Sequence, residues 1–426
     1  MLDIKRLRDD RDGVVAALDR RGDSFGETID RALALDARRR DALTEVNDLK
    51  ARRNAVSREV GTRKRAGEDA DDLIAEMREV GDAIDALDAA AKEAETSLHD
   101  LLLHIPNTPL DEVPAGGEEA NRVVGDGGAE PAFDFTPKPH WELGEDLGIL
   151  DLPGGARVSG SGFPVLRGAG ARLQRGLINF FLDRHVERNG YTEVRIPYLV
   201  HRSAMTGTGQ LPKFAEDSYH IERDDLWLIP TAEVPVTNLE SESLLEADRI
   251  PLHLTACSPC FRREAGAAGK DTRGLLRVHQ FDKVELVRYE RPEESRAALE
   301  DLTRQAEELL TDLGLRWRRV LLAGGDLGFS SALTFDLEVW APGVESWLEV
   351  SSCSVFTDYQ ARRAGLRFRP APGEKPEYVH TLNGSALALP RTVAALLETH
   401  QEADGSVRIP EVLQPWVGMD RIAVAS

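Results

Sequence analysis

A sustained heptad pattern between residues 73 and 98 restricts the fold more than any other feature of the sequence. Its apolar or alanine positions alternate spacings of four and three, which places them along one seam of a helix that packs against a second helix. The preceding residues, about 28–65, carry a looser version of the seam, and the RAGEDADD between them suits a helix end, a turn and a new helix start. The sequence therefore predicts an antiparallel coiled-coil hairpin over about residues 30–103. The seam residues are Leu73, Met77, Val80, Ile84, Leu87, Ala91, Ala94 and Leu98.

Charge is divided unequally between the two arms of this hairpin. Residues 38–65 hold ten Arg or Lys residues, whereas residues 68–100 hold twelve Asp or Glu residues. Periodicity leaves two interpretations open: a solvated hairpin with ion pairs between its helices, or a basic stripe that binds a nucleic-acid backbone. The net charge of −21 argues against indiscriminate binding of nucleic acid, so any such site is local.

Composition excludes several classes of protein. A length of 426 residues suggests two or three domains. Three cysteines cannot form a disulfide framework, and the C-x-x-C of Cys257 and Cys260 has no second pair, so we expect no zinc. No apolar run approaches the roughly 18 residues needed to cross a bilayer, and the N-terminus lacks the apolar centre of a signal peptide. We therefore expect a cytoplasmic protein without a membrane partner.

The chain changes character twice after the hairpin. Residues 104–139 are rich in proline, glycine and acids and are predicted to form a linker. From residue 140 to 426, helical stretches alternate with short strand-like runs, and strands that follow one another with few helices between them favour an antiparallel sheet. The predicted fold is α+β, with an N-terminal arm over 1–103 and a second domain in which helices flank the sheet. The strand candidates are YTEVRIPYLV (191–200), whose Pro197 suits a sheet edge, and residues 226–230, 252–258, 278–290, 332–341, 346–356 and 380–389. Helices are expected at about 292–314 and 390–402.

The stretch CFRREAGAAGKDTRGLLRVHQFDKVEL, from Cys260 to Leu286, gathers basic residues around a glycine-rich centre in an acidic chain. Neither a Walker loop nor G-x-G-x-x-G is satisfied in the sequence, so a nucleotide would be bound by other means. On predicted strands, Arg262 and Glu264 face one side, so the pair can meet a phosphate and an amine or ribose. Phe281 and Glu285 likewise share one face, where the ring can stack on a purine.

Three further residues extend this candidate site. Arg391 opens the last long helix and is a phosphate candidate, and Glu349 with Ser352 offers hard oxygen ligands for Mg²⁺. Taken singly, each of these residues also has an ordinary structural explanation.

Together and in order, these motifs resemble those of the bacterial type of seryl-tRNA synthetase, a class II aminoacyl-tRNA synthetase family, over essentially the whole chain. GYTEVRIPYLV resembles motif 1, which builds the dimer interface in that family. FRREAGAAGKDTRGLLRVHQFDKVE resembles motif 2, and LNGSALALPR resembles motif 3. TAEVP resembles the serine-binding segment, and EVSSCSVFTDYQARR resembles the strand that holds Mg²⁺ and ATP. The resemblance implies that residues 140–426 form a class II synthetase catalytic domain behind a tRNA-binding helical arm.

The family's residue roles transfer by position. Those implied for catalysis are Arg262, Arg391 and Glu349. Those implied for ATP are Arg262, Arg263, Glu264, Val278, Phe281, Glu349, Val350, Ser351, Ser352 and Arg391, with Mg²⁺ on Glu349 and Ser352. Those implied for serine are Thr231, Ala232, Glu233, Arg262, Glu285, Asn383 and Ser385. Those expected to contact tRNA are Arg52, Arg53, Arg63 and Lys64 on the hairpin, and Arg273 on the basic loop within Cys260–Leu286. Arg263, Lys270 and Arg277 lie on the same basic loop as Arg273.

The implied activity is that of a serine–tRNA ligase. Such an enzyme forms seryl-adenylate from serine and ATP, and transfers the seryl group to the 3′ end of tRNA(Ser), and of tRNA(Sec) where present. A homodimer is implied as well. The alternatives are a ligase that charges a carrier protein, whose members lack the long hairpin, and a coiled-coil scaffold with a degenerate synthetase body. Arg263, Val355, Ala386 and Pro390 depart from the family's usual residues.

Overall fold

The computed structural model describes residues 1–265 and 273–423. The chain separates into two compact units, Met1–Asp19 with Asp23–Pro106, and Arg20–Gly22 with Asn107–Ser426. The chain therefore enters the second unit for three residues before it forms the long helices of the first.

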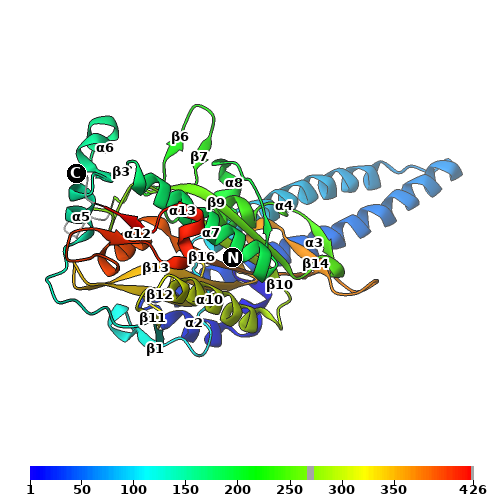
Figure 1. Ribbon diagram of the computed structural model, residues 1–426. Coiled ribbons are helices and arrows are strands. Elements are labelled where there is room, and N and C mark those ends of the chain that lie inside the picture. Colours follow the sequence, from blue (N-terminus) through cyan, green and yellow to red (C-terminus); the bar gives the residue numbers. More distant parts are fainter. Residues whose placement is uncertain (266–272, 424–426) are drawn as a thin grey trace. The chain divides into compact units, whose positions relative to one another are not determined.

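The first unit contains the predicted hairpin. Helices α1 (Ile4–Asp9) and α2 (Arg11–Asp19) precede α3 (Gly26–Ala66) and α4 (Asp71–Leu103), and α3 and α4 run side by side (Figure 1). Gly67 ends α3 at a φ of 77°, a left-handed conformation that glycine adopts without strain. In the seam, Val46 packs against Val80 and Ile84. The heptad period therefore predicted this hairpin correctly.

The second unit is built on an eight-stranded sheet of order β1-β11-β12-β13-β16-β10-β9-β4. All neighbouring strands are antiparallel except β4 and β9. The predicted antiparallel sheet is therefore confirmed. Its strands are β1 (Arg122–Gly127), β4 (Thr192–Glu193), β9 (Leu252–Phe261), β10 (Gln280–Glu290), β11 (Trp317–Leu321), β12 (Leu333–Ala341), β13 (Ser346–Thr357) and β16 (His380–Ala388).

Three helices supply most of the apolar surface that covers this sheet: α7 (Ala169–Asn189), α10 (Ser295–Asp312) and α12 (Leu389–Thr399). Helix α10 packs closely on β16, where a Cβ at Gly384 would lie 2.2 Å from Leu302 Cδ2. No helix in residues 1–265 and 273–423 combines the length and apolar character required to cross a bilayer.

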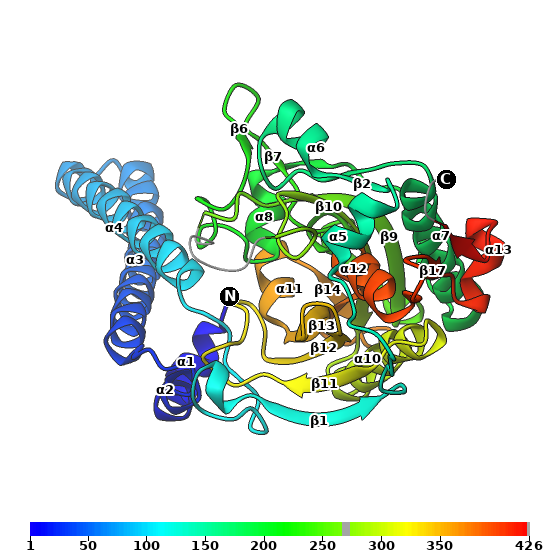
Figure 2. The same ribbon diagram turned by 60° about the vertical axis from the view of Figure 1, so that its left-hand side comes forward.

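Two segments differ from the sequence-based expectation. Residues 122–127, inside the predicted linker, form β1, which lies beside β11 at the sheet edge (Figure 2). The single strand expected across YTEVRIPYLV is divided into β4 and β5 (Leu199–His201), and Pro197, which has no N–H to donate to a ladder, lies in the gap. β5 belongs instead to a small sheet with β7 (Leu226–Leu228) and β6 (His220–Ile221).

The remaining elements are short. They are α5 (His140–Asp146), β2 (Leu150–Asp151), α6 (Leu152–Ser159), β3 (Val165–Leu166), α8 (Arg202–Gly207), α9 (Glu233–Thr237), β8 (Leu244–Glu246), α11 (Tyr359–Ala364), β14 (Arg367–Arg369), β15 (Glu377–Tyr378), β17 (Val407–Arg408), α13 (Gln414–Val417) and β18 (Arg421–Ile422).

Candidate active site

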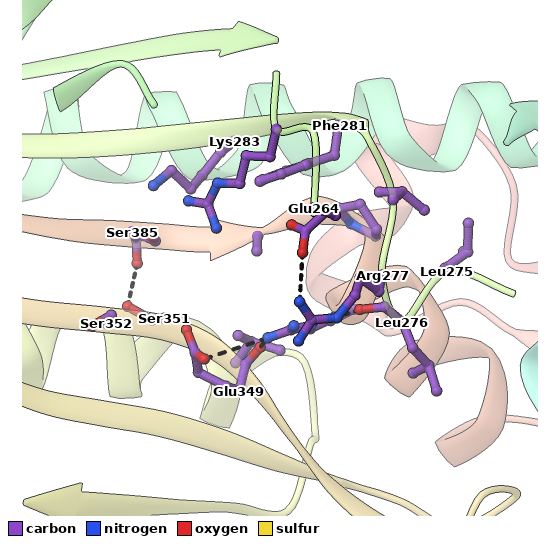
Figure 3. Close-up of a pocket in the computed structure, with 16 residues that line it drawn as sticks. Glu264, Leu275, Leu276, Arg277, Phe281, Lys283, Glu349, Ser351, Ser352 and Ser385 are labelled. Atoms are coloured by element: carbon purple, nitrogen blue, oxygen red, sulfur yellow. Dashed lines mark hydrogen bonds and ion pairs between the residues drawn. The ribbon is translucent and has the colours of Figure 1, made fainter. Parts of the chain in front are cut away.

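Residues of β10, β13 and β16, together with Arg262 just after β9, line two adjoining pockets. The main pocket is lined on one wall by Phe281 and Lys283 and on the opposite wall by Glu349, Ser351 and Ser352 (Figure 3). The second pocket, which we call the acidic pocket because Glu233 lines it, also has Thr231 and Asn383 among its polar residues. Four residues line both pockets, so a ligand in one can meet a ligand in the other. The shared residues are Arg262, Lys283, Ser352 and Ser385.

Arg262 has the central position between the pockets. Its guanidinium lies 5.3 Å from the centre of the Phe281 ring, a cation–π distance, and its Nε donates to the Pro230 carbonyl at 3.4 Å. The expected strand alternation of Arg262 and Glu264 is wrong, because β9 ends at Phe261 and Glu264 has a φ of 52°. Both side chains line the main pocket nevertheless, and Arg277 donates a hydrogen bond to the Glu264 carboxylate.

Arg391 approaches the main pocket from the first turn of α12. Its Nη1 donates to the Glu349 carbonyl at 2.8 Å, and its Nε donates to the Leu276 carbonyl at 3.0 Å. Pro390 lies in the same first turn, where a helix leaves its N–H groups without internal partners, so proline removes nothing that the helix needs. This departure from the family pattern therefore leaves Arg391 at the pocket. Of the other three departures, Val355 and Ala386 are buried in the core.

Glu285 is a fully buried carboxylate beside the acidic pocket. Its Oε2 lies 2.5 Å from Lys283 Nζ and accepts a hydrogen bond from the Thr231 hydroxyl at 2.8 Å. Its Oε1 accepts from Asn383 Nδ2 at 3.1 Å. A buried carboxylate needs a counter-charge and donors, and these three partners fix Glu285 in one orientation.

Glu233 lines the same pocket with a less complete set of partners. Its Oε1 accepts a hydrogen bond from Gln360 Nε2 at 2.7 Å, and the Thr381 hydroxyl orients Gln360 by donating to its Oε1 at 2.7 Å. Burial, and secondly the nearby charge of Glu285, raises the pKa of Glu233 from 4.5 to about 7. The acidic pocket thus contains a carboxyl group that a bound cation would ionise.

A third acidic group lies beside Glu349. Asp336 on β12 is paired in register with Ser352 on β13, and its Oδ1 is buried without a hydrogen-bond partner among the described residues. Burial, followed by the charge of Glu349, raises the pKa of Asp336 well above its usual range. Glu349 Oε2 lies 3.5 Å from Arg391 Nη1, so this carboxylate already has one cationic partner. Two carboxylates beside a hydroxyl suit a hard divalent cation. The described residues contain no set of three His, Cys, Asp or Glu side chains able to hold a metal, so other oxygens would complete the shell.

Several predicted site residues lie outside the two pockets. Arg263 lines neither of them, and its Nη1 donates to the Glu216 carbonyl at 3.1 Å. Ala232 is fully buried between Thr231 and Glu233. The guanidinium of Arg273 lies 4.7 Å from the centre of the Trp141 ring. Lys270 falls outside the described residues.

Lys283, Gln360, Asp336 and Arg277 were not predicted from the sequence to bind ATP, serine or a metal. Arg277 was only placed on the basic loop. The i, i+2 spacing of Lys283 and Glu285 on one strand was a usable signal, because such residues share a face. Gln360 and Asp336 had no comparable signal, since their partners are remote in the sequence.

The hairpin has ion pairs between its two helices, and it also has exposed basic residues on α3. Two of the predicted tRNA contacts on α3 are paired to α4: Arg52 lies 2.7 Å from Glu76, and Arg63 lies 3.3 Å from Asp72. The others, Arg53 and Lys64, are exposed and have no ion-pair partner within 4 Å among the described residues. Among the four predicted tRNA contacts on α3, Arg53 and Lys64 are therefore the two whose charge is available to an external anion.

Comparison with known proteins identifies the family. The model of the seryl-tRNA synthetase N-terminal domain matches residues 1–109, and that of the tRNA synthetase class II core domain (G, H, P, S and T) matches residues 217–400. The chain belongs to the seryl-tRNA synthetase family. This confirms the resemblance inferred from the motifs and the prediction of a class II core behind an N-terminal helical region.

Similar proteins of the seryl-tRNA synthetase family span the whole chain. A serine–tRNA ligase from Gemmatimonas aurantiaca is 57% identical over 98% of this chain and 99% of its own, and one from Carboxydothermus hydrogenoformans is 52% identical over 99% of each. The crystal structure of seryl-tRNA synthetase from Pyrococcus horikoshii complexed with ATP matches with a TM-score of 0.96 at 40% identity, covering 100% of both chains. That of a cytoplasmic serine–tRNA ligase from Naegleria fowleri in complex with AMP matches with a TM-score of 0.89 at 28% identity, covering 100% of this chain and 99% of its own.

Proposed function

We propose that the protein is an ATP-dependent serine–tRNA ligase that forms seryl-adenylate, releases pyrophosphate and transfers the seryl group to the 3′ end of tRNA(Ser), and of tRNA(Sec) where present. The observation that carries this proposal is the position of Arg262, which lines both pockets. Adenylation joins a carboxylate to an α-phosphate, so one cation must neutralise both anions where they meet. Full-length relatives named serine–tRNA ligase support the same activity.

ATP fits the main pocket by the chemistry of its walls. The adenine ring stacks on Phe281, with Glu264 and the main chain near Val278 accepting or donating hydrogen bonds at its edge. The phosphates lie between Arg262 and Arg391, which approach from different elements. A relative of 40% identity, the Pyrococcus horikoshii enzyme, was crystallised with ATP, which supports this assignment.

Serine fits the acidic pocket in one orientation. Its ammonium group is attracted by Glu233 and Glu285, its hydroxyl lies near Asn383 and Ser385, and its carboxylate points toward Arg262. The hydroxyl of Thr231 completes the polar lining. This orientation presents the carboxylate to the α-phosphate in the main pocket.

Glu349, Ser352 and Asp336 fit a magnesium ion that accompanies the nucleotide, because Asp336 has a buried oxygen without a hydrogen-bond partner among the described residues and lies beside a second carboxylate. Mg²⁺ is usually held by one or two carboxylates together with substrate phosphates. When bound there, it would neutralise phosphate charge.

The adenylation step follows from these positions. A serine carboxylate oxygen attacks the α-phosphorus, a new P–O bond forms, and the bond to the pyrophosphate oxygen breaks. Arg262 and Arg391 neutralise the charge that accumulates on the phosphoryl oxygens, so catalysis depends on positioning and electrostatics. A hydroxyl of the 3′-terminal tRNA ribose then attacks the seryl carbonyl and AMP leaves.

Two further partners belong to this proposal. The basic residues of α3 meet the phosphate backbone of tRNA, led by Arg53 and Lys64, which are exposed. A homodimer forms through the motif 1 segment and α7, where Val186 and Leu199 are among the exposed large apolar residues. The rival ligase that charges a carrier protein has no use for the hairpin, and the match of residues 1–109 to the seryl-tRNA synthetase N-terminal domain counts against it.

We expect ATP–pyrophosphate exchange with serine and far weaker exchange with alanine, glycine and threonine. Alanine and glycine leave the groups that meet the hydroxyl unpaired, and a site built to hydrogen-bond a hydroxyl rejects its analogue by about 10⁴-fold. Threonine is rejected because its extra methyl group must enter a filled pocket. Exchange rates measured with the four amino acids test the proposal, and no exchange with serine would refute it.

The KM for serine in this exchange is expected to rise as the pH falls below the pKa of Glu233, about 7. The ammonium group of serine favours the ionised carboxylate, so a protonated Glu233 must lose its proton first. Between pH 8 and pH 6 the KM should increase about tenfold while the KM for ATP changes little. Glu233→Gln should raise the KM and remove the dependence, whereas a flat profile in the unmodified enzyme would contradict this role.

The raised pKa of Glu233 also makes the free energy of unfolding depend on pH. Folding raises the pKa of Glu233 from 4.5 to about 7, so in that window the folded protein holds a proton that the unfolded chain has lost. The contribution of Glu233 to the free energy of unfolding therefore decreases as pH rises from about 4.5 to about 7.

A further inference from the structure

One wall of the acidic pocket is a loop between β11 and β12. Gly328, Phe329, Ser330 and Ser331 all line the pocket, and none of them belongs to a strand or helix. Leu327, Ser330 and Ser331 of this stretch are buried, and buried carbonyl groups without a strand partner must be satisfied by other donors.

Arg21 supplies most of these donors. Its Nε donates to the Asn107 carbonyl at 2.8 Å, its Nη1 to those of Leu327 and Gly328 at 3.1 and 3.3 Å, and its Nη2 to those of Gly328 and Ser331 at 3.3 and 2.6 Å. A guanidinium has five N–H donors, and all five are used here. Every acceptor is a neutral carbonyl group. Burial lowers the pKa of Arg21 to about 10, which still leaves it protonated at neutral pH.

Asn107 completes the set of donors to the loop. Its backbone N–H donates to the Phe329 carbonyl at 3.0 Å, and its Nδ2 donates to the Ser330 carbonyl at 2.9 Å. Together with Arg21, it satisfies the five consecutive carbonyl groups of residues 327–331. The path of the loop is thus set by donors more than 200 residues away in the sequence.

The loop of residues 327–331 in turn contacts Thr208 and Gly209 on another wall of the acidic pocket. The Ser330 hydroxyl donates to the Thr208 carbonyl at 2.9 Å, and a Cβ at Gly209 would lie only 2.0 Å from Ser330 Oγ. Thr208 and Gly209 also line the acidic pocket. A shift of the loop therefore alters two walls of the pocket at once.

We propose that Arg21 is a positioning residue for the amino-acid pocket, holding residues 327–331 in the path that shapes the pocket for serine. Arg21 touches no substrate and acts through the loop. The inference rests on the proposed function, since it takes the acidic pocket to be the serine site. Arg21 lies five residues before α3 begins, so the pocket wall is held by the chain segment that leads into the hairpin.

Arg21→Met tests this role, because methionine fills a similar apolar volume and donates no hydrogen bond. In ATP–pyrophosphate exchange, the KM for serine should rise about tenfold, while the KM for ATP and the maximal rate stay within about twofold. Discrimination against threonine should also fall, because a loosened wall admits the extra methyl group. Arg21→Lys keeps the charge without the fork of donors and should recover only part of the serine affinity.

Arg20→Met is the matched control. Arg20 belongs to the same three-residue segment and also donates to carbonyl groups, those of Leu110 and Pro109 at 2.9 Å each, but neither Leu110 nor Pro109 lines the main pocket or the acidic pocket. We expect its KM for serine to stay within twofold.

Equal rises in both KM values for Arg21→Met, or the same serine defect in Arg20→Met, would overturn the proposal. So would an unchanged KM in Arg21→Met. Should Arg21→Met fail to fold, the comparison of Arg21→Lys with Arg20→Lys decides on the same criterion. An unmodified enzyme without serine-dependent exchange would refute the proposed function instead.

Discussion

Arg262→Ala is expected to reduce serine-dependent ATP–pyrophosphate exchange by about a thousandfold or more. Arg262 lines both pockets, and the proposed reaction brings two anions together at its guanidinium. Removing a single donor to a developing oxyanion typically lowers the rate by about 10²–10³, and Arg262 also neutralises charge in the ground state. Arg262→Lys should recover little, because an ammonium group cannot donate to two oxygens in the fixed geometry of a guanidinium.

Arg263→Ala provides the control for this experiment. Arg263 is the adjacent residue with the same charge, but its side chain turns to the Glu216 carbonyl and lines neither pocket. Its replacement should change the exchange rate by no more than a few fold. Equal losses in the two variants would show that general positive charge, rather than the position of Arg262, supports the reaction.

The double variant Arg53→Glu, Lys64→Glu is expected to lower kcat/KM for aminoacylation of tRNA by about a hundredfold and to leave pyrophosphate exchange unchanged. The two side chains are exposed and unpaired within the described residues, so their reversal places negative charge against the tRNA backbone without breaking the hairpin. The dependence of tRNA affinity on salt should also become less steep, because fewer phosphate contacts release fewer counterions.

Lys92→Glu is the matched control on the other arm. Lys92 is an exposed basic residue of α4, the acidic helix of the hairpin. We expect its reversal to affect aminoacylation by less than about threefold. Equal losses from α3 and α4 would mean that the net charge of the hairpin, rather than a basic stripe on α3, attracts tRNA.

Local periodicity made the hairpin and the main strands predictable. The seam from Leu73 to Leu98 has a period that only a helix packed on a helix can use. The strands β10 and β12 were recognisable because β-branched, aromatic and apolar residues are frequent in them. Segments that break their own pattern were missed: β1 lies in a stretch rich in glycine and acids, and its pairing with β11 is decided by a partner about 190 residues away.

The candidate site was predictable where the motif itself carries the chemistry. Arg262, Phe281, Glu349 and Arg391 were singled out by residue type and position, and all of them line the main pocket. Arg263 was predicted to bind ATP like the adjacent Arg262, but its side chain points away from the main pocket to the Glu216 carbonyl.

By itself, the sequence determined the hairpin, the antiparallel sheet and the family to which the chain belongs, because these depend on local period and on the order of short motifs. Only the tertiary structure decided which charges are compensated. It pairs Glu285 with Lys283 and raises the pKa of Glu233 to about 7. On the hairpin, it pairs Arg52 with Glu76 and leaves Arg53 exposed. It also places Arg21 against a loop about 300 residues later in the chain. The physical reason is that burial and hydrogen bonding are properties of a side chain's surroundings in space, and those surroundings come from parts of the chain that no local pattern connects.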